Sequence, residues 1–91
     1  MKSILQSDER CYLCGSMYGL ERHHIMSGTA NRKISERYGV WCWLCHNCHT
    51  GTEGAQYIQA KNRRLKELAQ AQFEEIYGHQ LWMELFRKNY L

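Results

Sequence analysis

The placement of the cysteines constrains this chain more than any other feature. Four of the five fall in two Cys-x-x-Cys pairs, Cys11/Cys14 and Cys45/Cys48, about thirty residues apart. Thiolates three residues apart on a tight turn point the same way, so two such turns can form the tetrahedral sulfur cage of a structural zinc site. Gly15, directly after the first pair, permits the turn because glycine adopts positive φ without steric cost. We therefore predict a structural Zn²⁺ on these four cysteines.

The fifth cysteine leaves the register of the second pair open. Cys42, Cys45 and Cys48 are each three residues apart, so Cys42/Cys45 is an alternative pair. An odd number of cysteines argues against a disulfide framework. A redox dithiol would account for one pair but not for two. Paired cysteines in a reducing compartment are typical of metal sites.

The length of the chain fits a metal-stabilised domain. Its 91 residues are expected to form one domain over residues 1–91. A core of this size buries only about two-thirds of the unfolded surface, and a structural metal commonly adds the missing stability. The N-terminus has no apolar stretch typical of a signal peptide. No apolar run is long enough to cross a bilayer. We therefore expect a cytoplasmic protein with no membrane partner.

Turn residues and hydrophobic spacing divide the chain into two parts. Residues 1–50 are interrupted by glycines and contain two short strand candidates, at 20–25 and 40–44. After a break at 51–54, apolar residues recur at helical spacing from about residue 55 to a stop at Gly78. A second helix is predicted over about residues 80–89. The predicted fold class is a small α+β zinc-stabilised domain with C-terminal helices. Their apolar stripes are expected to form core against Trp41 or Trp43.

Three histidines lie beside these elements. His23 and His24 end the first strand candidate, and His49 directly follows Cys48. Neighbouring residues of a strand point to opposite faces, so one imidazole can bind a metal ion while the other faces an attacking water. A neutral imidazole is a suitable proton acceptor near pH 7. The alternative is that these histidines complete a structural site or belong to the core.

The order Cys-x-x-Cys-Gly, His-His-Ile, Leu-Cys-x-x-Cys-His resembles the zinc-containing HNH endonucleases over about residues 11–50. The C-terminal stretch is similar, less specifically, to small bacteriophage-encoded proteins with this motif. The resemblance implies a ββα-metal fold over about residues 11–50, to which the helices predicted from the apolar spacing add an extension over about 55–91. It also implies that the protein acts in the cytoplasm of a bacterial or phage-infected host cell. It implies that His24 is the general base. It also implies that His23 and His49 bind a catalytic divalent cation such as Mg²⁺, Mn²⁺ or Ni²⁺, away from the structural zinc.

The chain departs from the family pattern at two positions. The middle asparagine of the motif, which braces the loop between the strands, falls on Val40 here, and Asn31 and Asn47 are unranked candidates for its role. Many family members also have a third metal ligand on the helix. Glu53 stands near that place and Gln56 is a poor ligand, while water could complete the shell of a hard cation.

Basic residues surround the histidines in the sequence. The net charge is +3, and residues 22–66 contain eight Lys and Arg against two Glu. Such a segment fits a phosphate-rich partner. The candidate DNA-binding residues are Arg32, Lys33, Arg37, Arg63 and Arg64. For residues 61–66 an ordinary solvated helix face is the alternative.

The predicted function is that of a metal-dependent DNA endonuclease that hydrolyses phosphodiester bonds. A homodimer that nicks both strands is compatible with the sequence. One alternative is a zinc-stabilised module that binds nucleic acid without cutting it, which leaves the three histidines unexplained. Another is a protein-interaction domain that docks a partner on an exposed stripe around Trp82 and Phe86.

Overall fold

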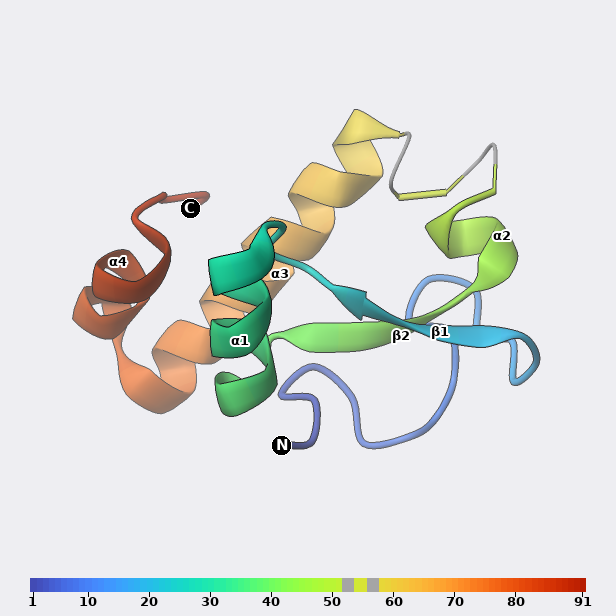
Figure 1. The fold of residues 1–91 in the computed structure, drawn as a ribbon, viewed down its shortest axis with the longest axis horizontal. Helices are drawn as coiled ribbons and strands as arrows, with labels where there is room; N and C mark the ends of the chain where they lie inside the picture. The colour runs from blue at the N-terminus through green and yellow to red at the C-terminus, as the bar shows by residue number, and fades with distance from the viewer. Residues whose placement is uncertain (52–53, 56–57) are drawn as a thin grey trace.

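The computed structural model describes residues 1–51, 54–55 and 58–91, with the element order β1-α1-β2-α2-α3-α4 (Figure 1). The strands are β1 (Leu20–His24) and β2 (Trp41–Cys45). The helices are α1 (Thr29–Tyr38), α2 (His46–His49), α3 (Gln59–Tyr77) and α4 (His79–Phe86). The α+β class is therefore confirmed, with both predicted strands and both predicted C-terminal helices present. The ββα-metal assignment stays a prediction.

The two strands form an antiparallel ribbon in which Leu20 lies opposite Cys45 and His24 lies opposite Trp41. This register brings the histidines at the end of β1 and the cysteines at the end of β2 to opposite ends of the ribbon. The short helix α2 follows β2 without a gap and carries Cys48 and His49. The ribbon therefore separates the cysteine pairs from His24.

Helix α1 lies between the two strands in the chain, where the sequence analysis places no helix. All of its residues are described, and Ser35 alone is buried. A helix that buries so little has no strong apolar stripe from which to recognise it. It ends at Gly39, whose φ is 76°. A Cβ at this position would collide with the backbone of Lys2, so glycine is required for the chain to turn here.

The hydrophobic core lies between one face of the ribbon and the helices α3 and α4. Val40, Cys42 and Leu44 contribute to this core together with Phe73 and Trp82. Alternation along β2 turns Trp41 and Trp43 to the other face, where their rings contact each other with centroids 5.2 Å apart. The prediction that the helices pack against Trp41 or Trp43 is therefore wrong.

The aromatic residues of α3 and α4 bury one another. Phe73 contacts Trp82 at a centroid distance of 5.4 Å, and Trp82 contacts Phe86 at 4.4 Å. Trp82 is fully buried and Phe86 is 6% exposed, so the exposed stripe of the protein-interaction alternative is wrong. Gly78 separates the two helices as predicted, with positive φ (91°) but an extended rather than left-handed ψ (159°). Within the described ranges, no helix is both long and apolar enough to span a membrane.

Candidate functional site

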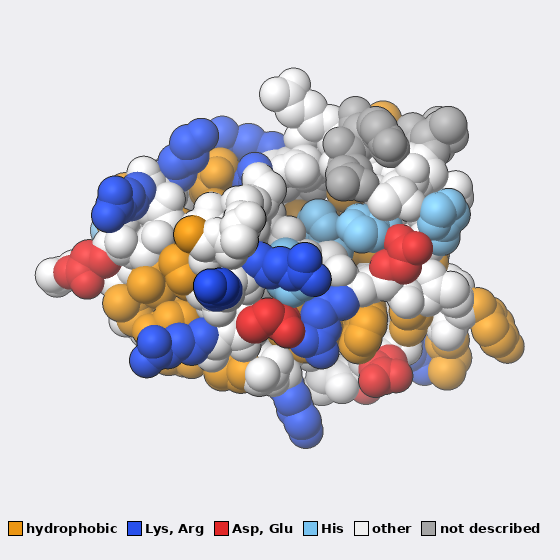
Figure 2. Space-filling model, viewed as in Figure 1, with side chains coloured by type: hydrophobic (Ala, Val, Ile, Leu, Met, Phe, Trp, Pro, Cys, Tyr) orange, Lys and Arg blue, Asp and Glu red, His pale blue; other side chains and the backbone are white. Residues whose placement is uncertain are grey.

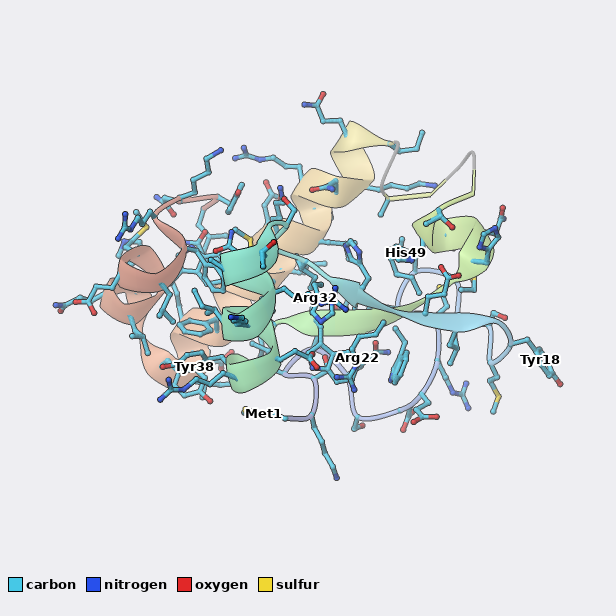
Figure 3. All side chains as sticks on the ribbon, viewed as in Figure 1. Met1, Tyr18, Arg22, Arg32, Tyr38 and His49 are labelled. Carbon is cyan, nitrogen blue, oxygen red and sulfur yellow. The ribbon has the colours of Figure 1, made fainter. Side chains whose placement is uncertain are left out.

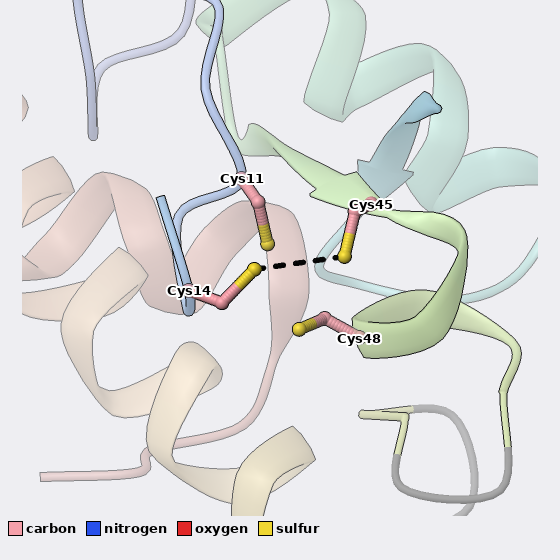
Figure 4. Close-up of side chains that lie close together, drawn as sticks. All are labelled: Cys11, Cys14, Cys45 and Cys48. Carbon is pink, nitrogen blue, oxygen red and sulfur yellow. Dashed lines mark hydrogen bonds between the residues drawn. The ribbon is translucent and has the colours of Figure 1, made fainter. Parts of the chain in front are cut away.

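Four cysteines from two distant segments meet at one point (Figure 4). The Sγ atoms of Cys11, Cys14, Cys45 and Cys48 all lie within 4.8 Å of one another. The Sγ atoms of Cys14 and Cys45 are 3.7 Å apart. Four sulfurs bound tetrahedrally to Zn²⁺ at about 2.3 Å are themselves about 3.8 Å apart. The cluster therefore has the donor atoms and the dimensions to bind a metal such as zinc.

The local backbone explains how the first pair is shaped. The N–H of Gly15 donates to the carbonyl of Cys11 at 2.8 Å, and the N–H of Cys11 donates to the carbonyl of Ser16 at 2.8 Å. Gly15 has the predicted positive φ, 81°. The N–H of Tyr12 donates to the carbonyl of Trp43 at 2.8 Å, which fixes this turn against β2. The second pair is brought together by α2 itself, because one turn of this helix separates Cys45 from Cys48.

The protonation of the cluster also fits a divalent cation. Burial alone would raise the pKa of Cys11, but backbone hydrogen bonds at Cys45, Cys14 and Leu13 outweigh it and lower the pKa to about 6. Burial, followed by the neighbouring cysteines, raises the pKa of Cys48 well above its ordinary value. Cys11 therefore loses its proton readily, and its negative charge disfavours ionisation of the neighbouring thiols. A bound Zn²⁺ would supply the positive charge that lets all four ionise.

Cys42 does not belong to this cluster. Its side chain is fully buried in the core, on the face of β2 that packs against the helices. Burial, with the nearby charge of Cys11 as a smaller cause, raises the pKa of Cys42 to about 12, so its thiol stays neutral. Of the two registers that the sequence leaves open, the fold brings together the one with Cys45 and Cys48.

The three predicted histidines meet in a hollow of about 420 Å³ beside the end of β1. The hollow is lined by Arg22, His23, His24, Ile25, Ser27, Arg32, Glu36, His49 and Asn62. Figure 2 shows histidine side chains at the surface beside basic and acidic side chains. His23 and His24 alternate as predicted, opposite Cys42 and Trp41 respectively. Both nevertheless line the hollow.

The rings of His23 and His49 lie close together. Their ring centroids are 5.0 Å apart, with an angle of 66° between the ring planes. Two imidazoles that bind one ion at about 2.1 Å have ring centres about 4.5–5.2 Å apart, depending on the coordination angle. Burial, followed by the positive charge of neighbouring histidines and Lys66, lowers the pKa of His23 to about 4. The ring is therefore neutral at pH 7, the form that binds a metal ion.

Glu21 is a residue of this site that the sequence analysis does not identify. Its carboxylate lies 2.7 Å from Nδ1 of His49 and 3.2 Å from Nδ1 of His46. These hydrogen bonds lower the pKa of Glu21, so the carboxylate is ionised and accepts the Nδ1–H of His49. This contact favours the tautomer of His49 that carries its proton on Nδ1. A carboxylate behind a metal-binding histidine is a common arrangement that fixes the ring and its tautomer.

Glu36, on α1, is a second carboxylate of the site that the sequence analysis does not identify. One of its oxygens lies 3.1 Å from Nε2 of His24, and Arg22 Nη1 donates to both oxygens, at 2.7 and 3.0 Å. The spacing of these residues along the chain gives no indication of the contact, because it depends on how α1 packs against β1. Asn31, a candidate brace in the motif, instead donates to the carbonyl of Ser27 at 2.8 Å.

The predicted DNA-binding residues fall in two groups. Arg32 lines the hollow (Figure 3), while Lys33 and Arg37 are exposed elsewhere on α1. Arg63 and Arg64 are exposed on α3, and each lies 3.5 Å from the carboxylate of Glu67. These five residues therefore come from two different helices, α1 and α3.

Two further observations limit the candidate site. The predicted ligand Glu53 lies outside the described residues. Among the residues that are described, the four cysteines are the one group of three or more side chains placed to hold a metal, and His23 and His49 are not part of such a group. A larger hollow of about 750 Å³ is lined by residues 1–9, Arg22, Trp41 and Trp43. It contains neither histidine nor cysteine, and the histidine hollow is the better candidate for chemistry.

Comparisons of the chain with protein-family models, curated proteins and solved structures gave no match.

Proposed function

We propose that this protein is a metal-dependent endonuclease that hydrolyses phosphodiester bonds of DNA at the histidine hollow. The observation that supports this most strongly is the convergence of His23, His24 and His49 on one hollow that also contains Arg22 and Arg32. His23 and His49 come from segments far apart in the chain, so the fold is what brings them close together. A purely structural role would not require Arg32 beside them.

In this proposal His23 and His49 hold the catalytic divalent cation. The donor set fits because burial keeps the ring of His23 neutral at pH 7 and the separation of the two rings suits one ion. Two histidines leave most of the coordination shell for water and phosphate oxygens, as a hard cation requires. Such an ion, when bound, would act as a Lewis acid that offsets the charge of the phosphate and of the leaving oxygen.

His24 acts as the general base. As the oxygen of a water molecule attacks phosphorus, His24 takes the proton that the water loses. The new phosphorus–oxygen bond forms while the bond from phosphorus to the 3′ oxygen breaks, and the leaving oxygen takes a proton from solvent. Arg32 at the rim of the hollow would bind a nonbridging phosphate oxygen, since a guanidinium donates two parallel hydrogen bonds to phosphate. The cysteine site supports the fold and takes no part in the reaction.

The cation site is tested by Mn²⁺ binding to the zinc-loaded protein, followed by electron paramagnetic resonance. We expect the wild type to bind one Mn²⁺ and His49→Ala to bind it at least about 10-fold more weakly, because one of two protein ligands is lost. His79→Ala is the matched control, since that histidine contacts Glu74 away from the hollow. Mn²⁺ should also support cleavage of DNA by the wild type. A folded, zinc-loaded wild type that binds no Mn²⁺ would leave the non-cutting DNA-binding module as the better account.

A further inference from the structure

Glu36 is the acidic side chain of the hollow that the reaction described above does not use. It comes from α1, whereas His24 is the last residue of β1. Its Oε2 atom lies 3.1 Å from Nε2 of His24. Both of its oxygens also accept hydrogen bonds from Arg22 Nη1, at 2.7 and 3.0 Å. The carboxylate therefore joins His24 to a permanent positive charge.

The contact with His24 decides which ring nitrogen carries the proton. Burial alone would raise the pKa of Glu36, but the hydrogen bond from His24 and the charge of Arg22 outweigh it and lower the pKa. Glu36 is therefore ionised at neutral pH, and an ionised carboxylate only accepts hydrogen bonds. The 3.1 Å contact of Glu36 with Nε2 of His24 therefore favours the tautomer that carries the proton on Nε2. A neutral imidazole has a single N–H, so Nδ1 carries the free lone pair.

The carboxylate is itself held in place. The guanidinium of Arg22 lies over the ring of Trp41, 3.7 Å from the ring centroid. Trp41 is 4% exposed and is the residue opposite His24 in the ribbon. A guanidinium stacked on a fixed indole has little freedom to move. The position of Glu36 relative to His24 is therefore fixed through Arg22 and Trp41, and Trp41 is the residue paired with His24 in the sheet.

We propose that Glu36 is a positioning residue that fixes the ring of His24 in the Nε2–H tautomer, so that Nδ1 is the atom that takes the proton from water. This inference rests on the proposed function. As the water's oxygen bonds to phosphorus, its proton passes to Nδ1, and the imidazolium that forms donates from Nε2 to Glu36. The negative charge of Glu36 stabilises this imidazolium, which a neutral side chain at the same place would not do.

The test combines a spectroscopic measurement with kinetics on the full chain. Long-range ¹H–¹⁵N correlation spectra of the zinc-loaded wild type should show His24 protonated at Nε2 and not at Nδ1. In Glu36→Gln that preference should weaken to a mixture of tautomers. We expect kcat for DNA cleavage by Glu36→Gln to fall about 10- to 100-fold, as for other carboxylates that orient functional histidines, with KM unchanged within about twofold. Glu75→Gln, which replaces an exposed carboxylate on α3, should match the wild type in both measurements.

The outcomes separate this inference from the proposed function. A wild type that cleaves DNA, with Glu36→Gln cleaving at the same rate, would overturn the positioning role and leave the nuclease intact. Wild-type His24 protonated at Nδ1 would overturn it as well, whether or not the variant folds. A loss of kcat in Glu36→Gln without any change of tautomer would also contradict it. A wild type that cuts no DNA would overturn the proposed function itself, even if His24 shows the expected tautomer.

Discussion

Separate replacement of Cys48 and Cys42 by alanine distinguishes a metal ligand from a core residue six positions away. Cys48 is one of four thiols whose sulfurs lie within 4.8 Å of one another, whereas Cys42 is fully buried among apolar side chains. Structural zinc contributes about 10 kcal/mol or more to the folding of small domains. A domain of this size has a total stability of about 5–15 kcal/mol. We therefore expect that loss of one cysteine of the cluster unfolds the chain.

The loss in free energy of unfolding expected for Cys42→Ala is much smaller. The change removes one buried sulfur atom and leaves a cavity of about that size, comparable to the loss of a methylene group at about 1 kcal/mol. We expect Cys42→Ala to be folded and to contain one equivalent of zinc. We expect Cys48→Ala to be unfolded or insoluble and to lack stoichiometric zinc.

The assay is zinc content by mass spectrometry of the purified proteins, with thermal unfolding followed by circular dichroism. Addition of a strong chelator should unfold the wild type and Cys42→Ala alike, since both depend on the same ion. If Cys42→Ala loses its zinc while Cys48→Ala keeps one equivalent, the register with Cys42 and Cys45 is correct and the cluster described above is wrong. If both variants keep zinc and stability, the metal does not hold this fold together.

Three further predictions concern acid stability, DNA binding and the core. The pKa of His23 is about 4 in the folded protein, against 6.5 for an exposed histidine. The free energy of unfolding is therefore highest above pH 6.5 and falls as the pH drops toward 4, because the unfolded chain binds a proton at this histidine and the folded chain does not. Between pH 7.5 and pH 5 the wild type should lose about 2 kcal/mol more than His23→Phe in urea titrations, and equal losses would refute the burial argument. Arg32→Ala should reduce the salt dependence of DNA binding by about one counterion, because Arg32 lines the hollow and is the residue proposed to bind a phosphate oxygen, whereas Arg10→Ala should not. Trp82→Ala should cost about 3–5 kcal/mol, because the ring is fully buried, and a change below about 1 kcal/mol would contradict the packing of α4.

The elements that could be predicted are those whose signal is local. Paired cysteines with a following glycine, a short aromatic strand and a helix that ends at Gly78 each depend on residues close together in the sequence. The structure accordingly has both strands, the turn at Gly15 and the two C-terminal helices near the predicted positions. The burial of Trp82 and Phe86 follows from the same periodicity, which favours core over an exposed docking stripe.

The features that could not be predicted depend on packing. Helix α1 carries mostly polar residues, and its position between the strands has no strong local signal. The contacts of Glu21 with His49 and of Glu36 with His24 join residues 28 and 12 positions apart, and a single glutamate gives no hint of such a partner. The wrong prediction that the C-terminal helices pack against Trp41 or Trp43 could have been avoided. Strand alternation alone places Val40, Cys42 and Leu44 on one face and the two tryptophans on the other.

Cleavage of supercoiled plasmid DNA by zinc-loaded wild type and His24→Ala, side by side with Mg²⁺, Mn²⁺ or Ni²⁺, tests the central claim most directly. His24 and Cys45 lie at opposite ends of the ribbon, so both proteins should contain one equivalent of zinc and bind DNA with equal affinity. The wild type should convert the plasmid to nicked or linear forms with at least one of these ions. His24→Ala should be about 10²- to 10⁴-fold slower, the usual cost of removing a general base. Equal rates for the two proteins, or no cleavage by a folded wild type with any of the ions, would contradict the account.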